Sequence, residues 1–350
     1  MEPKETPALL QGQAEIWQLI YGSVDSMALK CVVELRIADI IHSHGGPITL
    51  RQIASEVDSP SPSIAYLVRI MRLLVRKNIF TEHHHLVESG ETLYGLTQTS
   101  RWLLRDAELS IVPLVLLRNH PMQLAPLHCL SQSVKKGGTA FKKVHGCEVW
   151  DFTSKNPEYN NIFNDAMACM TKSVMAALLA EYNDGFGGTV GSLVDVGGGI
   201  GGMMAKIVKA HPCIKGVNFD LPHVVAITPV RQGVSQVGGD MFDAIPNTDA
   251  ILVGRVLHNW SDEDCMKILK NCRKAIPKNG GNVIIVHVVL EKESKDLFDE
   301  TRMAFDLLMM AYTTGGKERT ELKLLEEAGF GRYKIFKIAT IPSIVEAYPE

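Results

Sequence analysis

A glycine-rich turn at residues 197–202 follows the apolar run 193–196 directly and precedes a helical pattern. Glycine at such a junction permits a tight turn and lets a ligand approach the backbone. Asp220, at the end of the next apolar run, can accept hydrogen bonds from both hydroxyls of a ribose. The turn also satisfies the G-x-G-x-x-G pattern, which is a weak signal when it stands alone. These residues predict a nucleotide-type ligand and leave a dinucleotide dehydrogenase open.

Ligand-type residues also follow the later apolar runs. Asp240 and Met241 stand in an acidic turn, where a carboxylate could bond an adenine amino group and a thioether could pack on the ring. His258 and Trp260 follow the run 250–253, which puts an imidazole and a large ring at the rim of the same crevice. Ligands of open α/β sheets bind outside the carboxyl ends of the strands. Ligand-type groups at several strand ends in a row are hard to explain as packing alone.

The elements that must position these groups are short apolar runs that alternate with helical patterns from Ser192 onward. Such alternation predicts a mostly parallel, doubly wound sheet with helices on both faces. The predicted strands are 193–196, 216–219, 250–253, 282–286 and 333–336.

The N-terminal third has a different, mostly helical pattern. Residues 14–41 predict two consecutive amphipathic helices, and Thr49 is a good N-cap for a third. A helix over 64–78 and a hairpin of 79–81 with 93–96 complete a winged-helix pattern. Four basic side chains could form a recognition helix, but they are also the solvated stripe of an amphipathic helix: Arg69, Arg72, Arg76 and Lys77.

Composition excludes several classes of function. The net charge of −3 and the pI near 6.5 offer too little positive potential for nucleic acid. Seven cysteines without a C-x-x-C pair, a polar N-terminus and no uninterrupted apolar stretch of membrane length predict a cytoplasmic protein without a membrane span. The histidines at 83–85 have no cysteine or acidic ligand at coordinating spacing, so we expect no metal.

Five motifs, in order, make the chain resemble the plant small-molecule O-methyltransferases of the caffeic acid and isoflavone type over essentially its whole length. Residues 26–30 and 145–151 look most similar to enzymes that act on benzylisoquinoline alkaloids. The five motifs lie at 194–199, 219–224, 239–242, 257–263 and 315–320.

The resemblance implies an S-adenosylmethionine-dependent Rossmann-like domain over 107–350 and a winged-helix domain over 1–106 that forms a homodimer. It implies that His258 is the general base toward a phenolic hydroxyl, whose ordinary pKa is near 10. The implied cofactor-binding residues are Gly197, Gly199, Asp220, Leu221, Asp240, Met241, Trp260 and Thr171. The implied acceptor-pocket residues are Met167, Met170, Leu308, Met309 and Asp306.

The expected acceptor is a benzylisoquinoline or protoberberine alkaloid, with an isoflavonoid or phenylpropanoid as the alternative. Asp165 or Asp306 could attract an alkaloid's ammonium group, although a surface ion pair between Asp306 and Arg302, four residues earlier, would explain both of these residues. A weakly active relative that only binds ligand is the other alternative, besides the dehydrogenase.

The chain departs from the family pattern close to the expected base. His287 stands where the family has a carboxylate, which leaves Glu318 alone to orient His258. We expect His287 either to oppose the charge that develops on His258 or to point away from it. Three further departures are Gly254-Arg255 in place of Lys-Trp, Thr171 in place of serine, and a shortened stretch over 320–328.

Overall fold

The computed structural model describes the chain except for residues 1–4, 85–90, 187–190, 292–295 and 319–322. The chain divides into two compact units, each of which we describe by itself. The first comprises residues 1–124 and 157–170, and the second comprises 125–156 and 171–350. The expected turn at 88–90 and part of the shortened stretch at 320–328 lie outside the described residues.

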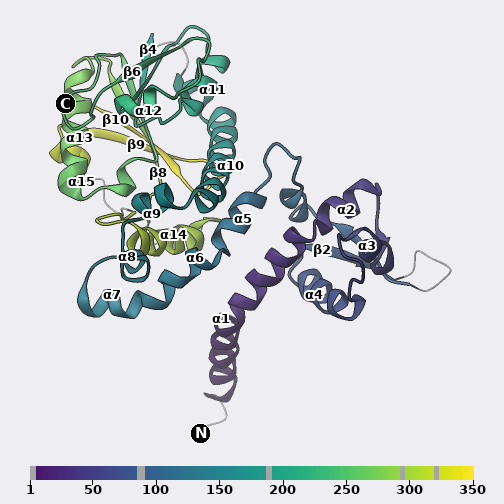
Figure 1. The fold of residues 1–350 in the computed structure, drawn as a ribbon. Coiled ribbons are helices and arrows are strands. Elements are labelled where there is room, and N and C mark those ends of the chain that lie inside the picture. The colour runs from purple at the N-terminus through teal and green to yellow at the C-terminus, as the bar shows by residue number, and fades with distance from the viewer. Residues whose placement is uncertain (1–4, 85–90, 187–190, 292–295, 319–322) are drawn as a thin grey trace. The chain divides into compact units, whose positions relative to one another are not determined.

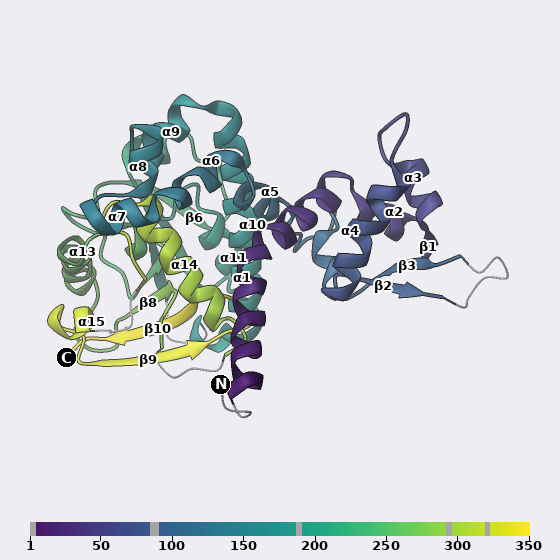
Figure 2. The ribbon, with the colours of Figure 1, turned by 90° about the horizontal axis from the view of Figure 1, so that it is seen from below.

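The first unit contains the predicted helices and hairpin (Figure 2). Thr49 caps its helix through a capping box with Gln52, as its position predicted. The strands pair antiparallel in the order β1-β3-β2, and helices α2 to α4 pack beside them in one apolar core. The elements are α1 (Glu5–Glu34), α2 (Ile37–Ser43), β1 (Ile48–Thr49), α3 (Leu50–Glu56), α4 (Ile64–Arg76), β2 (Phe80–His83), β3 (Leu93–Leu96), η1 (Ser100–Leu103), α5 (Val112–Arg118) and α6 (Pro121–Leu124).

The second unit is built on a seven-stranded sheet in the order β6-β5-β4-β7-β8-β10-β9 (Figure 1). Five strands run parallel, and β10 pairs antiparallel with both β8 and β9. The mostly parallel sheet is thus confirmed, and two strands that the sequence analysis missed, β6 and β10, extend it. The strands are β4 (Ser192–Val196), β5 (Lys215–Asp220), β6 (Val234–Gly238), β7 (Ala250–Gly254), β8 (Asn282–His287), β9 (Arg332–Lys337) and β10 (Ser343–Tyr348).

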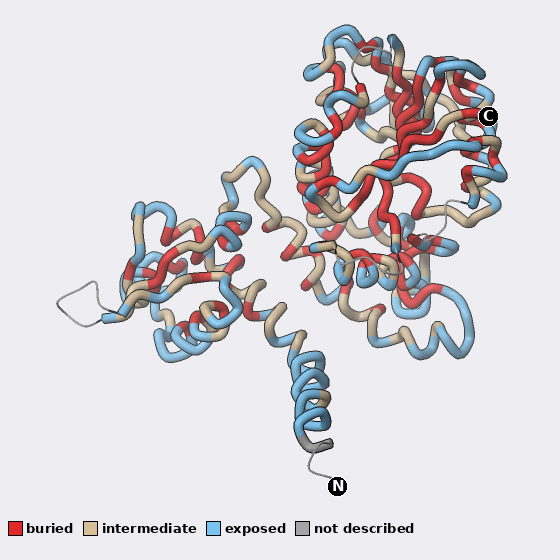
Figure 3. Tube along the Cα trace, turned by 180° about the vertical axis from the view of Figure 1, so that it is seen from behind, coloured by how far each residue is buried: buried red, intermediate tan, exposed pale blue. Residues whose placement is uncertain are grey.

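Helices cover both faces of this sheet. Because successive side chains of a strand point to opposite faces, neighbouring residues of a strand pack against different helices. Val194 packs toward α13 (Asp262–Ala275) and α15 (Lys323–Glu327), whereas Leu193 packs toward α11 (Gly202–Ala210) and the second half of α10 (Pro157–Glu181). The central strands β4, β7, β8 and β10 are accordingly the most deeply buried part of the unit, whereas the edge strand β9 is exposed (Figure 3). The remaining elements are η2 (Ala125–Cys129), α7 (Leu130–Lys136), α8 (Ala140–His145), α9 (Val149–Lys155), η3 (Asn183–Phe186), α12 (Pro222–Val225), η4 (Leu257–Asn259) and α14 (Asp299–Tyr312).

By length and composition, α10 is the one described helix that could cross a membrane. Within its most apolar stretch, 39% of the helix is buried inside the protein. Since the core helix of a globular protein meets the same criterion, α10 is weak evidence for a membrane span, and packing against the sheet accounts for the apolar residues of its second half.

Arg302 lies in the interior, which corrects the expected surface pair with Asp306. The residue is only 2% exposed. Its Nη1 lies 2.9 Å from Asp299 Oδ1 and 3.2 Å from Asp296 Oδ1, and its Nε donates to the carbonyl oxygen of Ile341 at 2.8 Å. Arg302 therefore pairs with carboxylates at and just before the start of α14. Asp306 instead accepts a hydrogen bond from the Glu318 amide.

Arg302→Met should therefore destabilise the second unit by about 3 kcal/mol, because two half-buried carboxylates and a carbonyl lose their counter-charge or donor. Urea denaturation of the whole chain measures the loss. Lys323→Met is the matched control, since the exposed pair between Lys323 and Glu327 contributes less than about 1 kcal/mol. Equal effects of the two substitutions would contradict a structural role for Arg302.

Candidate active site

The predicted ligand groups gather along one edge of the sheet. Strands β4 to β8 are parallel, so their carboxyl ends all reach the same edge. The glycine turn follows β4, Asp220 ends β5 and His287 ends β8, while Asp240 and His258 stand shortly after β6 and β7. The sheet topology alone therefore brings five separate sequence segments to one site.

The glycine turn after β4 needs its glycines for conformation and for space. Gly197 and Gly199 have φ angles of 68° and 58°, which side-chain-bearing residues rarely adopt. A Cβ on Gly198 would lie 2.2 Å from Oδ1 of Asn218. Asn218 is fully buried beneath the turn and donates from Nδ2 to the carbonyl oxygen of Gly199 at 2.8 Å. Asn218 thus supports the turn from the protein interior. The turn is open at Gly199, where an added Cβ would meet no atom within 4 Å.

Asp220 is fastened to this turn. Its Oδ2 accepts from the Gly199 amide at 2.8 Å and its Oδ1 accepts from the Leu221 amide at 2.7 Å. Asp220 is half-buried, so its remaining lone pairs are available to a ligand. Asp195 lies fully buried nearby, where burial and the charge of Asp220 raise its pKa to about 7.

The acidic turn after β6 is anchored by α13. Asp240 Oδ1 accepts from the Phe242 amide at 2.8 Å. Asn271 donates to the carbonyl oxygens of Met241 and Phe242, both at 3.0 Å. The ring of Trp260 meets the ring of Phe242 edge-on, with centroids 4.8 Å apart. Asp240, Met241 and Trp260 therefore belong to one packed group.

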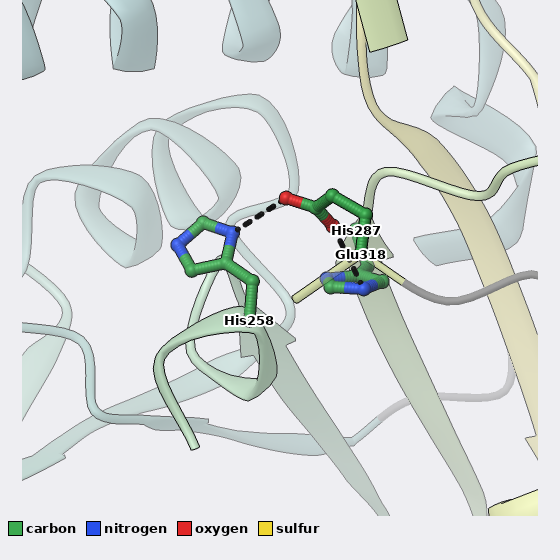
Figure 4. Close-up of side chains that lie close together, drawn as sticks. All are labelled: His258, His287 and Glu318. Atoms are coloured by element: carbon green, nitrogen blue, oxygen red, sulfur yellow. Dashed lines mark ion pairs between the residues drawn. The ribbon is translucent and has the colours of Figure 1, made fainter. Parts of the chain in front are cut away.

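His258, Glu318 and His287 form a second, buried group at the same edge (Figure 4). Glu318 lies between the two imidazoles: its Oε1 is 3.3 Å from Nδ1 of His258, and its Oε2 is 3.0 Å from Nε2 of His287. The Glu318 side chain is 0% exposed, and both histidines are buried. Glu318 thus lies beside His258, as expected, and His287 contacts the same carboxylate.

The burial of this group sets its protonation. Burial lowers the pKa of His258 below its ordinary value, and the neighbouring Glu318 offsets this only in part. Burial would raise the pKa of Glu318, but the two imidazoles beside it bring that pKa to about 2. At neutral pH the group therefore contains an ionised carboxylate facing a neutral His258.

Two backbone-amide hydrogen bonds hold the loop that carries Glu318 beside the base. The Lys317 amide donates to the carbonyl oxygen of His258 at 3.2 Å, and the Glu318 amide donates to Asp306 Oδ1 at 2.8 Å. A Cβ on Gly316 would lie 2.8 Å from the same His258 carbonyl oxygen, so only glycine permits this approach. Asp306 thus positions the carboxylate that faces His258.

The structure brings together only some of the predicted acceptor residues. On α14, Met309 is buried and Leu308 is half-buried against the aromatic cluster around Phe141. Met167 and Met170 belong to the first unit, so their place in an acceptor pocket stays a prediction. Thr171 accepts a hydrogen bond from Arg255 Nη1 at 3.0 Å.

Three residues near the site were missed by the sequence analysis. The ring of Phe305 lies 6.0 Å from the ring of His258. Asn218 and Asn271 support the glycine turn and the acidic turn from below. Both asparagines could have been predicted, because a polar residue within an apolar strand or on the apolar face of a helix is unusual. Phe305 could not, because its sequence position is that of an ordinary core residue.

Two family models match the chain. The O-methyltransferase domain matches residues 127–331, and the O-methyltransferase dimerisation domain matches residues 17–106. The desmethylxanthohumol 6'-O-methyltransferase of Humulus lupulus is 54% identical over 97% of this chain and 99% of its own. The (R,S)-reticuline 7-O-methyltransferase of Papaver somniferum is 52% identical over 97% of this chain and 98% of its own.

Solved structures agree on the fold. The SAH-bound form of CalO1, a methyltransferase in calicheamicin biosynthesis, superposes with a TM-score of 0.83 at 24% identity and covers all of both chains. A shared glycine turn had left a dinucleotide dehydrogenase open, and the match of both domains to methyltransferase models removes that alternative. This chain belongs to the S-adenosylmethionine-dependent O-methyltransferases.

Proposed function

We propose that the chain transfers the methyl group of S-adenosylmethionine to a phenolic hydroxyl, with His258 as the general base. The observation that carries the proposal is the contact between Nδ1 of His258 and the buried carboxylate of Glu318. A carboxylate favours the proton on Nδ1, which leaves the lone pair on Nε2 free to accept the phenol's proton. In other enzymes, too, a carboxylate that faces Nδ1 orients the histidine that acts as base through Nε2.

The cofactor supplies an electrophilic methyl group, and the residues after β4 to β7 fit its binding. The open glycine turn admits a ligand against the backbone at Gly199, and Asp220 has lone pairs left for ribose hydroxyls. Asp240 offers an acceptor and Met241 and Trp260 offer apolar surface for an adenine. Leu221, which is 42% exposed beside Asp220, and Thr171 complete the proposed set.

For the acceptor, we propose a neutral phenol rather than the alkaloid expected from resemblance. The two carboxylates near His258, Glu318 and Asp306, already face the imidazoles and a backbone amide. An alkaloid's ammonium group would have to find its counter-charge elsewhere. Relatives of similar identity are named for desmethylxanthohumol and for reticuline, so a competition between these two acceptors decides the preference.

We also propose that the chain is a homodimer. The N-terminal part of α1 is exposed (Figure 3), its exposed residues up to Val24 include many apolar ones, and the first unit matches the family's dimerisation domain. An apolar set of this size marks an interaction surface. The exposed residues are Leu9, Leu10, Ile16, Trp17, Leu19, Ile20, Tyr21 and Val24.

Glu318→Gln should lower single-turnover methyl transfer at least about a hundredfold, because a neutral amide no longer favours the productive tautomer of His258. Glu300→Gln, on the exposed side of α14, is the control and should leave the rate unchanged. Binding of S-adenosylhomocysteine should stay the same in both variants. Full methyl transfer in Glu318→Gln would overturn the proposed base.

Asp220→Ala should weaken binding of S-adenosylhomocysteine roughly tenfold to a hundredfold, since it removes charge-assisted hydrogen bonds to the ribose and to the glycine turn. Isothermal titration calorimetry measures the affinity. The control is Asp243→Ala, an exposed carboxylate close to the same edge. Equal affinities of the two variants would remove Asp220 from the cofactor site.

Trp17→Glu in α1 should shift the chain from dimer to monomer in sedimentation velocity at micromolar concentration, because it places a charge within the apolar set. Trp150→Glu, an equally exposed tryptophan on α9, is the control and should remain dimeric. A wild-type monomer with full activity would contradict the dimer.

A further inference from the structure

The group around Glu318 has the composition and spacing of a metal site. Two imidazole nitrogens and a carboxylate oxygen, from His258, His287 and Glu318, all lie within 4.8 Å of one another. Tetrahedral zinc bonds its ligands at about 2.0 to 2.2 Å, which separates ligand atoms by about 3.3 Å. The contacts of 3.3 Å and 3.0 Å, which end on different oxygens of Glu318, are close to that separation.

The buried polar atoms of this group lack ordinary hydrogen-bond partners. Within the described ranges, neither ring nitrogen of His287 and neither carboxylate oxygen of Glu318 makes a hydrogen bond of normal geometry. The two side chains are 6% and 0% exposed, so water does not readily replace the missing partners. Buried polar atoms left in this way are costly, and a cation between them would satisfy both.

His287 is the residue that makes the set selective. Carboxylates alone favour hard cations such as magnesium, whereas two imidazoles and one carboxylate suit zinc, nickel or copper. The His258 and His287 rings approach Glu318 from two different strand ends, with their centroids 5.9 Å apart.

We propose that His258, His287 and Glu318 bind a divalent transition metal of the zinc class, and that metal binding and base catalysis exclude one another. A neutral imidazole has one lone pair. When Nδ1 of His258 gives that pair to the metal, the proton must reside on Nε2, and that nitrogen can no longer accept the phenol's proton. The metal would thus act as an inhibitor of methyl transfer. This consequence rests on the proposed function, whereas the binding itself does not.

The test is a titration of the untagged, chelator-treated full chain with Co²⁺, a spectroscopic substitute for Zn²⁺, without cofactor or acceptor. We expect a visible absorption band of four-coordinate Co²⁺ that saturates at one equivalent. His287→Asn should weaken this site at least about tenfold, because an amide is a poor ligand for these metals. Glu318→Gln is a second variant should His287→Asn fail to fold. The control is His84→Asn in the exposed hairpin, which should keep the band.

In the methyl transfer assay, Zn²⁺ should inhibit the wild type over the range that fills the site, EDTA should restore the rate, and His287→Asn should need at least tenfold more Zn²⁺. Absence of the band, or the same band in wild type, His287→Asn and Glu318→Gln, would overturn the metal site. A saturating band without inhibition would overturn the exclusion of catalysis. A chain that binds Co²⁺ as expected but transfers no methyl group would contradict the proposed function alone.

Discussion

The carboxylate of Glu318, buried and ionised between two imidazoles, is the constraint on which the active-site edge depends. Withdrawing a charged carboxylate from water costs several kcal/mol unless its surroundings compensate. Here the segment after β7, the end of β8 and the loop after α14 bring His258 and His287 to within 3.3 Å of the carboxylate, without ordinary hydrogen-bond geometry at its oxygens. The bond from Asp306 to the Glu318 amide and the glycine at 316 fix the loop in place. The geometry of the base thus depends on the packing of the whole second half of the sheet.

The other half of the sheet serves the cofactor by a separate means. The turn after β4 and the acidic turn after β6 rest on buried asparagines, Asn218 and Asn271, that bond backbone carbonyl oxygens. Backbone atoms held from below keep their shape without a ligand, so the proposed cofactor site is largely preformed. The two halves meet at β4 and β7, where the proposed methyl donor and base would lie side by side.

Much of this arrangement could be predicted from the sequence, because the signals are local. Apolar runs followed by glycine or acidic residues predicted β4, β5, β7 and β8 and the groups at their ends. Strand β6 has two valines separated by two polar residues and is only partly buried, so it contains no apolar run by which the sequence could predict it. The strand β10 contains Glu346, a buried acid whose pairing with Tyr182 depends on a contact 164 residues away.

Side-chain pairing was the least predictable feature. Helical spacing predicted a pair between Arg302 and Asp306, but the arginine turns inward to Asp296 and Asp299, and the aspartate bonds the Glu318 amide. The replacement of a carboxylate by His287 was visible in the sequence as a departure from the family. That His287 shares Glu318 with the base was not, since it depends on where the loop after α14 returns to the sheet.

The most direct test of this account is the tautomer of His258, which nitrogen-15 NMR of the metal-free, imidazole-labelled chain reports at neutral pH. Assignment of the signal requires a His258→Gln sample for comparison. The account predicts a neutral ring with its proton on Nδ1, facing Glu318, and a bare Nε2. A neutral ring protonated at Nε2, or a ring that is already doubly protonated at neutral pH, would contradict the role of Glu318 in preparing the base.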